Sequence, residues 1–266
     1  MAAPETDVKT DVIAVRGVGK TFPQGRERVE VLHEIDLTIP RGSFVTLFGP
    51  SGCGKSTLLR LLAGLQQQDT GDVSLFGSTP REAARRKEIA WIPQSSAVLP
   101  WRTVRGNALL SRVVNRRGGA GRVPQDVGGT LGELGLDRFA GFLPRQLSGG
   151  MRQRTALARG FVQGAPLMLM DEPFSALDEF TRERARRVLL DAWEQHRRTV
   201  VMVTHSAIEA VLVSDLVVVM TSRPGRIRAV VPVDLPRPRG HDVEDSAEFL
   251  DIVRRIKVEL RAGEET

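Results

Sequence analysis

The stretch FVTLFGPSGCGKST, residues 44–57, joins the nearly all-apolar run FVTLF to a loop that holds three glycines and a lysine. The apolar run at 44–48 predicts a strand buried on both faces, and STLLRLLAGL at 56–65 predicts a helix after the loop. Between them, GPSGCGKS fits G-x-x-x-x-G-K-[ST] in the strand–loop–helix context that this motif requires. Its glycines let backbone N–H groups surround phosphate oxygens, and the helix N-terminus adds partial positive charge. The stretch therefore predicts an α/β fold that binds the phosphates of a nucleotide.

Residues 49–57, the glycine loop, also carry side chains with predicted roles. Lys55 is expected to neutralise the β- and γ-phosphates, and the Ser56 hydroxyl is expected to bind Mg²⁺. Cys53 is interpreted as a small loop residue that thiol reagents reach when nucleotide is absent. The residues expected to contact nucleotide are Gly49, Pro50, Ser51, Gly52, Cys53, Gly54, Lys55, Ser56 and Thr57.

Length and composition are those of a globular protein. The chain has 266 residues, of which 41% are hydrophobic and 26% charged. No apolar run approaches the ~20 residues that span a bilayer, and the acidic N-terminal segment does not resemble a signal peptide. The single cysteine excludes a disulfide framework and a cysteine-rich zinc site. We expect a cytosolic location.

The positive charge is compatible with a nucleic acid partner, but its distribution does not favour one. Net charge is +6, and lysine occurs only at positions 9, 20, 55, 87 and 257. Arginine therefore carries nearly all of the positive charge and is spread along the whole chain, as a biased genome composition produces. We expect no nucleic acid partner.

An antiparallel β subdomain is predicted on the N-terminal side of the glycine loop. Apolar and polar residues alternate before residue 44, which indicates half-buried strands, and residues 71–77 predict another edge strand. The residues expected to face the core are Val31, Ile35, Leu37 and Ile39.

Later apolar runs predict a mainly parallel core sheet, because each is continuous and adjoins a helical pattern. A helical insertion subdomain is predicted at about 95–160, where glycine clusters separate helix-compatible pieces. The three runs are LMLM at 167–170, TVVMV at 199–203 and LVVVM at 216–220.

The two ends of the chain are predicted to lie outside the main domain, which spans residues 11–230. Residues 1–10 are expected to be disordered, and residues 231–266 form an extension. Within it, EFLDIVRRIKVEL predicts an amphipathic helix, with Asp245 and Glu248 spaced like a capping box. We interpret it as a docking helix, with partner binding as the alternative. The residues on its apolar face are Phe249, Val253, Ile256 and Leu260.

Two carboxylates, Asp171 and Glu172, directly follow the apolar run at 167–170. Sites in parallel sheets form at the carboxyl ends of strands, so both are expected to face the glycine loop. Asp171 suits a water-mediated ligand of Mg²⁺. Glu172 suits the general base that polarises the attacking water.

Two further polar residues follow predicted strands at the same edge. His205 comes directly after the strand that contains residues 199–203, within expected reach of a γ-phosphate. Gln94 lies where another strand enters the helical insertion, and its amide is expected to contact both Mg²⁺ and the attacking water.

A second glycine-rich loop, LSGGM at 147–151, has no lysine. Ser148 can cap the helix that follows, while Gly149 and Gly150 permit close backbone approach, so the loop forms a second anion site. A site whose charge is supplied elsewhere needs no lysine of its own. A second copy placed head to tail brings its LSGGM loop over the first copy's phosphates, which predicts a homodimer that encloses two ATP molecules.

These motifs, in this order, resemble the ATP-binding subunit of ABC transporters over roughly residues 11–230. The resemblance implies the P-loop NTPase fold of ABC ATPases and the same head-to-tail ATP sandwich. It also implies that Phe22 stacks on adenine and that Asp178 lies in the loop linking the two active sites. The motifs that carry it are GPSGCGKST at 49–57, Gln94, LSGGMRQR at 147–154, LMLMDEP at 167–173, SALD at 175–178 and His205.

Finer features resemble the nitrate, sulfonate and taurine importer branch, namely LPWRTV at 99–104 and SRPGRI at 222–227. The Pro100–Trp101 pair would lie near the membrane subunit, although packing within the insertion is an equal alternative for Trp101. This chain departs from the family pattern at Phe22, where tyrosine is commoner, and at Ser206, where aspartate is usual after the histidine. The insertion segment RRGGAGRVPQDVGG also differs.

The resemblance implies an ATPase subunit that energises import of a small anionic solute, using ATP and Mg²⁺. Its implied partners are membrane permease subunits and, through them, an extracytoplasmic solute-binding protein. Its implied place is the cytoplasmic face of the bacterial membrane. One alternative is a soluble ATPase acting on nucleic acid or ribosomes. A nucleotide-dependent regulator that barely hydrolyses is a third hypothesis, and Glu172 and His205 argue against it.

Overall fold

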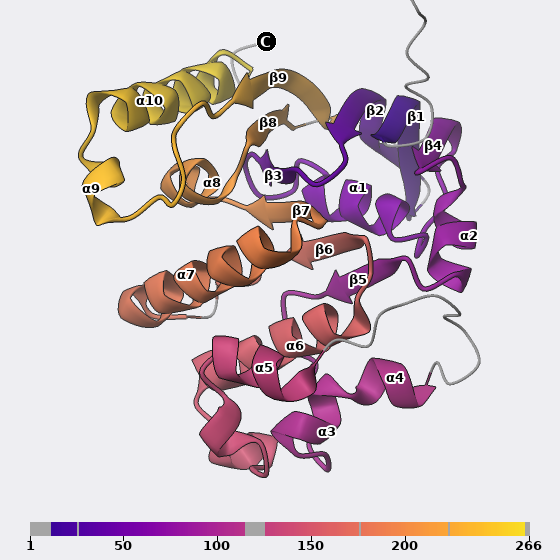
Figure 1. Cartoon of the computed structure of the whole chain (residues 1–266). Helices are drawn as coiled ribbons and strands as arrows, with labels where there is room; N and C mark the ends of the chain where they lie inside the picture. Colours follow the sequence, from indigo (N-terminus) through magenta and orange to yellow (C-terminus); the bar gives the residue numbers. More distant parts are fainter. Residues whose placement is uncertain (1–11, 26, 115–125, 176, 223, 264–266) are drawn as a thin grey trace, which may run out of the picture.

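The computed structural model describes residues 12–25, 27–114, 126–175, 177–222 and 224–263. It contains a six-stranded sheet and a three-stranded sheet, with helices on both sides of the larger one (Figure 1). The predicted disorder of residues 1–10 lies outside the described residues, as do Ala176, Arg223 and most of the RRGGAGRVPQDVGG segment.

The larger sheet has the strand order β5-β6-β7-β3-β8-β9. Its first five strands run parallel, and β9 pairs antiparallel with β8 at one edge. Every residue of β3, β6 and β7 is buried, which is why these strands read as continuous apolar runs. The mainly parallel core sheet is confirmed. The strands are β3 (Phe44–Phe48), β5 (Ile89–Ile92), β6 (Leu167–Asp171), β7 (Thr199–Thr204), β8 (Leu216–Thr221) and β9 (Arg226–Pro232).

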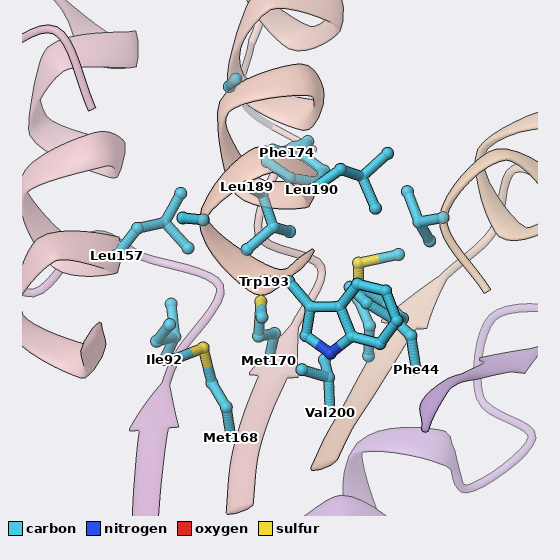
Figure 2. Packing of buried hydrophobic residues seen from close by; sticks show 14 of the residues in the cluster. Phe44, Ile92, Leu157, Met168, Met170, Phe174, Leu189, Leu190, Trp193 and Val200 are labelled. Carbon is cyan, nitrogen blue, oxygen red and sulfur yellow. The ribbon is translucent and has the colours of Figure 1, made fainter. Parts of the chain in front are cut away.

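Alternate side chains of these strands enter two separate hydrophobic cores. Phe44 and Val200 join the core under the helices α6, α7, α8 and α10, while Val45 and Val201 join the core with α1 and the smaller sheet. In the first core, Trp193 of α7 meets Phe44 edge to face, with ring centroids 5.6 Å apart (Figure 2). The helices named here are α1 (Lys55–Leu62), α6 (Gly149–Gln163), α7 (Glu179–His196), α8 (Ala207–Val213) and α10 (Ala247–Ala262).

The three-stranded sheet is antiparallel, in the order β2-β1-β4, and confirms the predicted N-terminal β subdomain. Val31 is partly buried and packs against the core that contains α1, and its neighbour Leu32 is fully buried. Between Leu32 and Ile35, β2 advances three residues while β1 advances two, and Glu34 has a φ of 48°. This bulge shifts the alternation by one position. The strands are β1 (Val12–Gln24), β2 (Glu27–Pro40) and β4 (Thr70–Leu75).

The helical insertion between β5 and β6 packs its short helices against α6. A fully buried Asn107 organises its entry, because the Asn107 side chain accepts from the backbone N–H of Leu99 and donates to the carbonyls of Leu99, Arg102 and Thr103. The helices are α3 (Val104–Ala108), α4 (Leu110–Val114) and α5 (Val127–Glu133), with 3₁₀ turns at Asp137–Phe139 and Pro144–Gln146; α2 (Pro80–Arg85) lies earlier, between β4 and β5.

Two arginines fasten the segment after β9 to the core. The Arg239 guanidinium donates to four backbone carbonyls, and its burial lowers its pKa to about 10. Arg237 pairs with Asp215 at 2.8 Å and lies 4.4 Å from the centroid of the Trp193 ring.

The C-terminal segment ends in α9 (His241–Glu244) and α10, and α10 packs against α8, β8 and β9 (Figure 1). Phe249, Val253 and Ile256 are its buried residues. The predicted capping box of Asp245 and Glu248 was wrong, because Asp245 closes α9 and the Ser246 hydroxyl caps α10 by accepting from the Phe249 N–H.

Replacing Phe249 by Ala should lower the free energy of unfolding by about 3–5 kcal/mol, because a buried aromatic side chain leaves a cavity. Guanidinium unfolding followed by circular dichroism measures this loss. The neighbouring Leu250 is 51% exposed, so Leu250→Ala is the matched control and should cost less than about 0.5 kcal/mol. Equal effects of the two changes would contradict the docked position of α10.

Candidate active site

Neighbouring strands of the larger sheet end in register, and their following residues form one edge, called here the carboxyl edge. Phe48 of β3 pairs with Thr204 of β7, and Asp171 of β6 pairs with Val203. The next residues along the chain are therefore delivered side by side, as expected for a site at the carboxyl ends of parallel strands. These residues are Gly49, Glu172 and His205, with Gln94 two residues after β5.

Two glycines of the glycine loop, Gly49 and Gly54, are needed for close contacts within this chain. A Cβ atom at Gly49 would lie 2.4 Å from the Met220 carbonyl oxygen, and one at Gly54 would lie 2.5 Å from Leu32 Cδ2. Gly54 also has a φ of 90°, so it precedes α1 in a conformation that glycine favours and offers no side-chain cap to the helix. The first N–H groups of α1 are thus left for an anion.

Lys55 is buried at the base of this loop. Its Nζ donates to the carbonyl oxygens of Gly49 at 2.8 Å and Pro50 at 2.6 Å. The ammonium group is thereby held inside the curve of the loop, where phosphate oxygens would be neutralised.

Ser56 and Asp171 meet although 115 residues separate them in sequence. The Ser56 hydroxyl donates to Asp171 Oδ1 at 2.8 Å, and Asp171 is only 6% exposed. Hydroxyl and carboxylate oxygens are ligands that Mg²⁺ takes together with water and substrate phosphates. The chemistry of this pair therefore fits a magnesium ion.

Glu172 lies at the centre of a second group. Gln94 Nε2 donates to Glu172 Oε2 at 3.1 Å, and His205 Nδ1 lies 3.7 Å from the same oxygen. The backbone of Glu172 has a φ of 45°, which is uncommon for a residue with a side chain. This conformation is held by hydrogen bonds from the Glu172 N–H to Val203 O and from Ser175 to Glu172 O. The structure thus brings together Gln94, Glu172 and His205.

Ser206, which replaces the family's usual aspartate, caps α8. Its hydroxyl accepts from the Glu209 N–H at 3.2 Å. Serine and aspartate are both good N-caps. The departure from the family pattern therefore leaves the start of α8, directly after His205, intact.

Within the LSGGM loop, Gly150 packs against this chain's own α7, whereas Ser148 and Gly149 face solvent. A Cβ at Gly150 would lie 2.3 Å from Thr181 Cγ2, so packing against α7 already requires this glycine. Ser148 and Gly149 are exposed, and a Cβ at Gly149 would meet nothing within 4 Å. Among the described residues, no hydrogen bond joins them to the glycine loop. Ser148 caps α6 by accepting from the Met151 N–H.

Phe22 and Asp178 lie outside these two groups. Phe22 is half-buried on β1, with Lys20 Nζ 5.4 Å from its ring centroid. Asp178 is the exposed N-cap of α7, and hydrogen bonds from Thr181 hold the pKa of its carboxyl below the ordinary value. The adenine-stacking and active-site-linking roles stay predictions.

Sequence reasoning missed two buried polar residues that organise the site's surroundings. Asn107 shapes the segment between Gln94 and the insertion, and Glu209 lies behind His205 in α8. Glu209 is a single polar residue in the apolar stretch 207–213, Asn107 lies among other polar residues, and the sequence alone gives no sign of what either contacts.

The ABC transporter family model matches residues 32–175. An aliphatic sulfonates import ATP-binding protein, SsuB, of Bacillus cereus is 35% identical over 251 residues, which cover 94% of this chain and 96% of that protein. A putative ATP-binding protein of Brucella abortus is 44% identical over 232 residues, 85% of each chain.

A solved structure shares this architecture. The dimeric post-hydrolysis state of the ATP-binding cassette MJ0796, bound to ADP and Pi, matches with a TM-score of 0.71 and 29% identity, over 86% of this chain and 99% of that one. No helix in the described part of the chain is long and apolar enough to cross a membrane.

The expectation that thiol reagents reach Cys53 was wrong, because Cys53 is fully buried. Burial also raises the pKa of its thiol, against the opposing effect of Lys55. The folded protein at pH 8 should therefore react with a thiol reagent at least ~10-fold more slowly than the same chain in guanidinium. The chain has one cysteine, so the rate at which the thiol reagent is consumed reports on Cys53 alone. Equal rates in the folded and unfolded chain would contradict the buried position.

Proposed function

The chain belongs to the ABC transporter family and is an ATP-hydrolysing, ATP-binding subunit, and we propose that it energises import of a small anionic solute through partner membrane subunits. The observation that supports catalysis is the convergence of Gln94 and His205 on Glu172, beside the Ser56–Asp171 pair. Aliphatic sulfonates are the proposed solute class, because several relatives carry that name; nitrate and taurine, a zwitterionic sulfonate, are the solutes to compare.

Glu172 is proposed as the general base. Its carboxylate accepts the proton of the attacking water, while Gln94 and His205 fix the carboxylate at the carboxyl edge. Lys55 and the first N–H groups of α1 hold the phosphates, and Phe22 is proposed to stack on adenine. Ser56, Asp171 and Gln94 would hold Mg²⁺, which neutralises charge on the β- and γ-phosphate oxygens when bound.

The second half of each site is proposed to come from a second copy of the chain. Ser148 and Gly149 are exposed, and the described residues offer them no phosphate-binding partner in their own chain. A head-to-tail homodimer would place them over the partner's glycine loop, with Asp178 between the two sites. The dimeric state named for the MJ0796 structures supports this arrangement.

The membrane partner is proposed to dock at the entrance of the helical insertion. Trp101 is 73% exposed, so the alternative of packing within the insertion was wrong. Asn107 fixes the turn that presents Trp101, and this turn follows the Gln94 segment in sequence. A change at Gln94 can thus reach the docking surface. The protein would then act at the cytoplasmic face of the membrane, and an extracytoplasmic solute-binding protein would deliver the solute.

The import role is tested by purifying tagged Glu172→Gln protein from detergent-solubilised native membranes with ATP and Mg²⁺. Recovery of a multi-span permease supports import, and the permease can then be reconstituted in vesicles with the wild-type ATP-binding subunit and its binding protein. Aliphatic sulfonates should stimulate ATP hydrolysis there more than nitrate or taurine does. Recovery of ribosomes or nucleic acid without a membrane protein would contradict the import role.

Changing Glu172 to Gln should lower kcat by about 10²–10⁴-fold, because the amide cannot accept the proton of the attacking water. ATP binding should persist, and a dimer should accumulate with ATP. Phosphate release measures kcat, and analytical ultracentrifugation measures the accumulation of the ATP-bound dimer. The exposed Glu248→Gln on α10 serves as a control and should leave both unchanged. Unchanged turnover in the Glu172→Gln protein would remove Glu172 from the base role.

Changing Ser148 to Arg should abolish turnover and ATP-dependent dimerisation while sparing ATP binding to the monomer. The bulky cation would block a site that two chains complete, whereas the glycine loop of the same chain stays unchanged. Asp251→Arg, at an exposed position on α10, is the matched control, because it adds the same cation away from the LSGGM loop. A fluorescent ATP analogue measures binding. If binding fell together with turnover, the two-chain site would be contradicted.

A further inference from the structure

A ring of hydrogen bonds lies directly behind His205 and joins Thr204, Ser206 and Glu209. The Ser206 N–H donates to Thr204 Oγ1 at 3.2 Å, and the Thr204 hydroxyl bonds to Glu209 Oε2. The Glu209 N–H donates in turn to Ser206 Oγ at 3.2 Å. The ring encloses the backbone on both sides of His205, so it fixes the direction in which the imidazole leaves the chain.

Glu209 is an unusual member of this ring, because it is a carboxyl group that is only 5% exposed. Burial raises the pKa of this carboxyl above its ordinary value, although the Thr204 hydrogen bond and the charges of Arg186, Arg182 and His205 oppose the rise. Burying a carboxyl group costs free energy unless hydrogen bonds or opposite charges compensate for the lost hydration. Capping α8 does not require it, since Ser206 provides the cap.

Within the described residues, the His205 side chain has few contacts that fix its orientation. Its side chain is 63% exposed, and its nearest ionic contact is Glu172 at 3.7 Å. A small cavity of about 30 Å³, lined among others by Glu172, His205 and Glu209, lies beside the imidazole. A cavity of that size admits water, so packing alone does not keep the ring toward Glu172.

We propose that Glu209 is a positioning residue for ATP hydrolysis: through the Thr204 hydroxyl it fixes the turn 204–206 and holds His205 beside Glu172. The inference rests on the proposed roles of Glu172 and His205. Glu209 itself does not touch the nucleotide. Its carboxylate oxygen accepts from Thr204, and the same hydroxyl oxygen accepts from Ser206, so the two bonds form one directed chain.

Four substitutions separate hydrogen bonding from bulk. Glu209→Ala and Thr204→Val break the ring and should each lower kcat by about 10–100-fold with KM for ATP nearly unchanged, because misplacing a catalytic group affects the chemical step. Glu209→Gln keeps an acceptor and Thr204→Ser keeps the hydroxyl, so both should retain kcat within about threefold. The exposed Asp251→Ala on α10 is the control for removing a carboxylate elsewhere.

A double-mutant cycle tests whether Glu209 acts through His205. Adding Glu209→Ala to His205→Ala should lower kcat no further, because the positioned group is already gone. An equal loss in both backgrounds, equal loss in the conservative variants, or wild-type turnover in His205→Ala would each overturn the proposal. Circular dichroism checks folding, and if Glu209→Ala does not fold, the nearly isosteric Thr204→Val supplies the cycle.

The base role of Glu172 is judged separately in the same assay. Turnover retained in Glu172→Gln would contradict the base role. The kcat values of the Glu209–His205 double-mutant cycle would then still show whether Glu209 acts through His205.

Discussion

The pairing of β7 with β3 on one side and β6 on the other sets the geometry of the candidate site. Because Phe48 lies opposite Thr204 and Asp171 opposite Val203, the strands β3, β6 and β7 end at the same level of the sheet. A slip of one residue in either pairing would turn alternate side chains toward the wrong core. The two cores on opposite faces of the sheet therefore fix the register, and the register fixes the site.

The carboxyl edge concentrates features that are unfavourable elsewhere in a protein. Lys55, Asp171 and Glu209 are buried polar groups, and Glu172 has a left-handed backbone. Each is stabilised by specific partners: loop carbonyls for Lys55, the Ser56 hydroxyl for Asp171, and the Thr204 hydroxyl for Glu209. Such local costs are typical of sites whose geometry serves chemistry.

Other features are left incomplete within one chain. Ser148 and Gly149 are exposed to solvent, whereas the neighbouring Gly150 packs so closely against Thr181 that a larger side chain would clash. Trp101 is exposed on a turn that a buried Asn107 holds in place. An ordered but exposed group of this kind is the expected form of a surface that a partner completes.

The phosphate loop, the buried strands and the two carboxylates at the end of β6 are predictable from the sequence, because motif spacing and continuous apolar runs are local signals. Which of these residues meet depends on how distant segments pack together. The Ser56–Asp171 contact and the Gln94–Glu172–His205 group depend on strand order, which distant segments set together. The bulge that buries Leu32 and the burial of Cys53 and Glu209 also depend on packing partners far along the chain, and no local pattern encodes those partners.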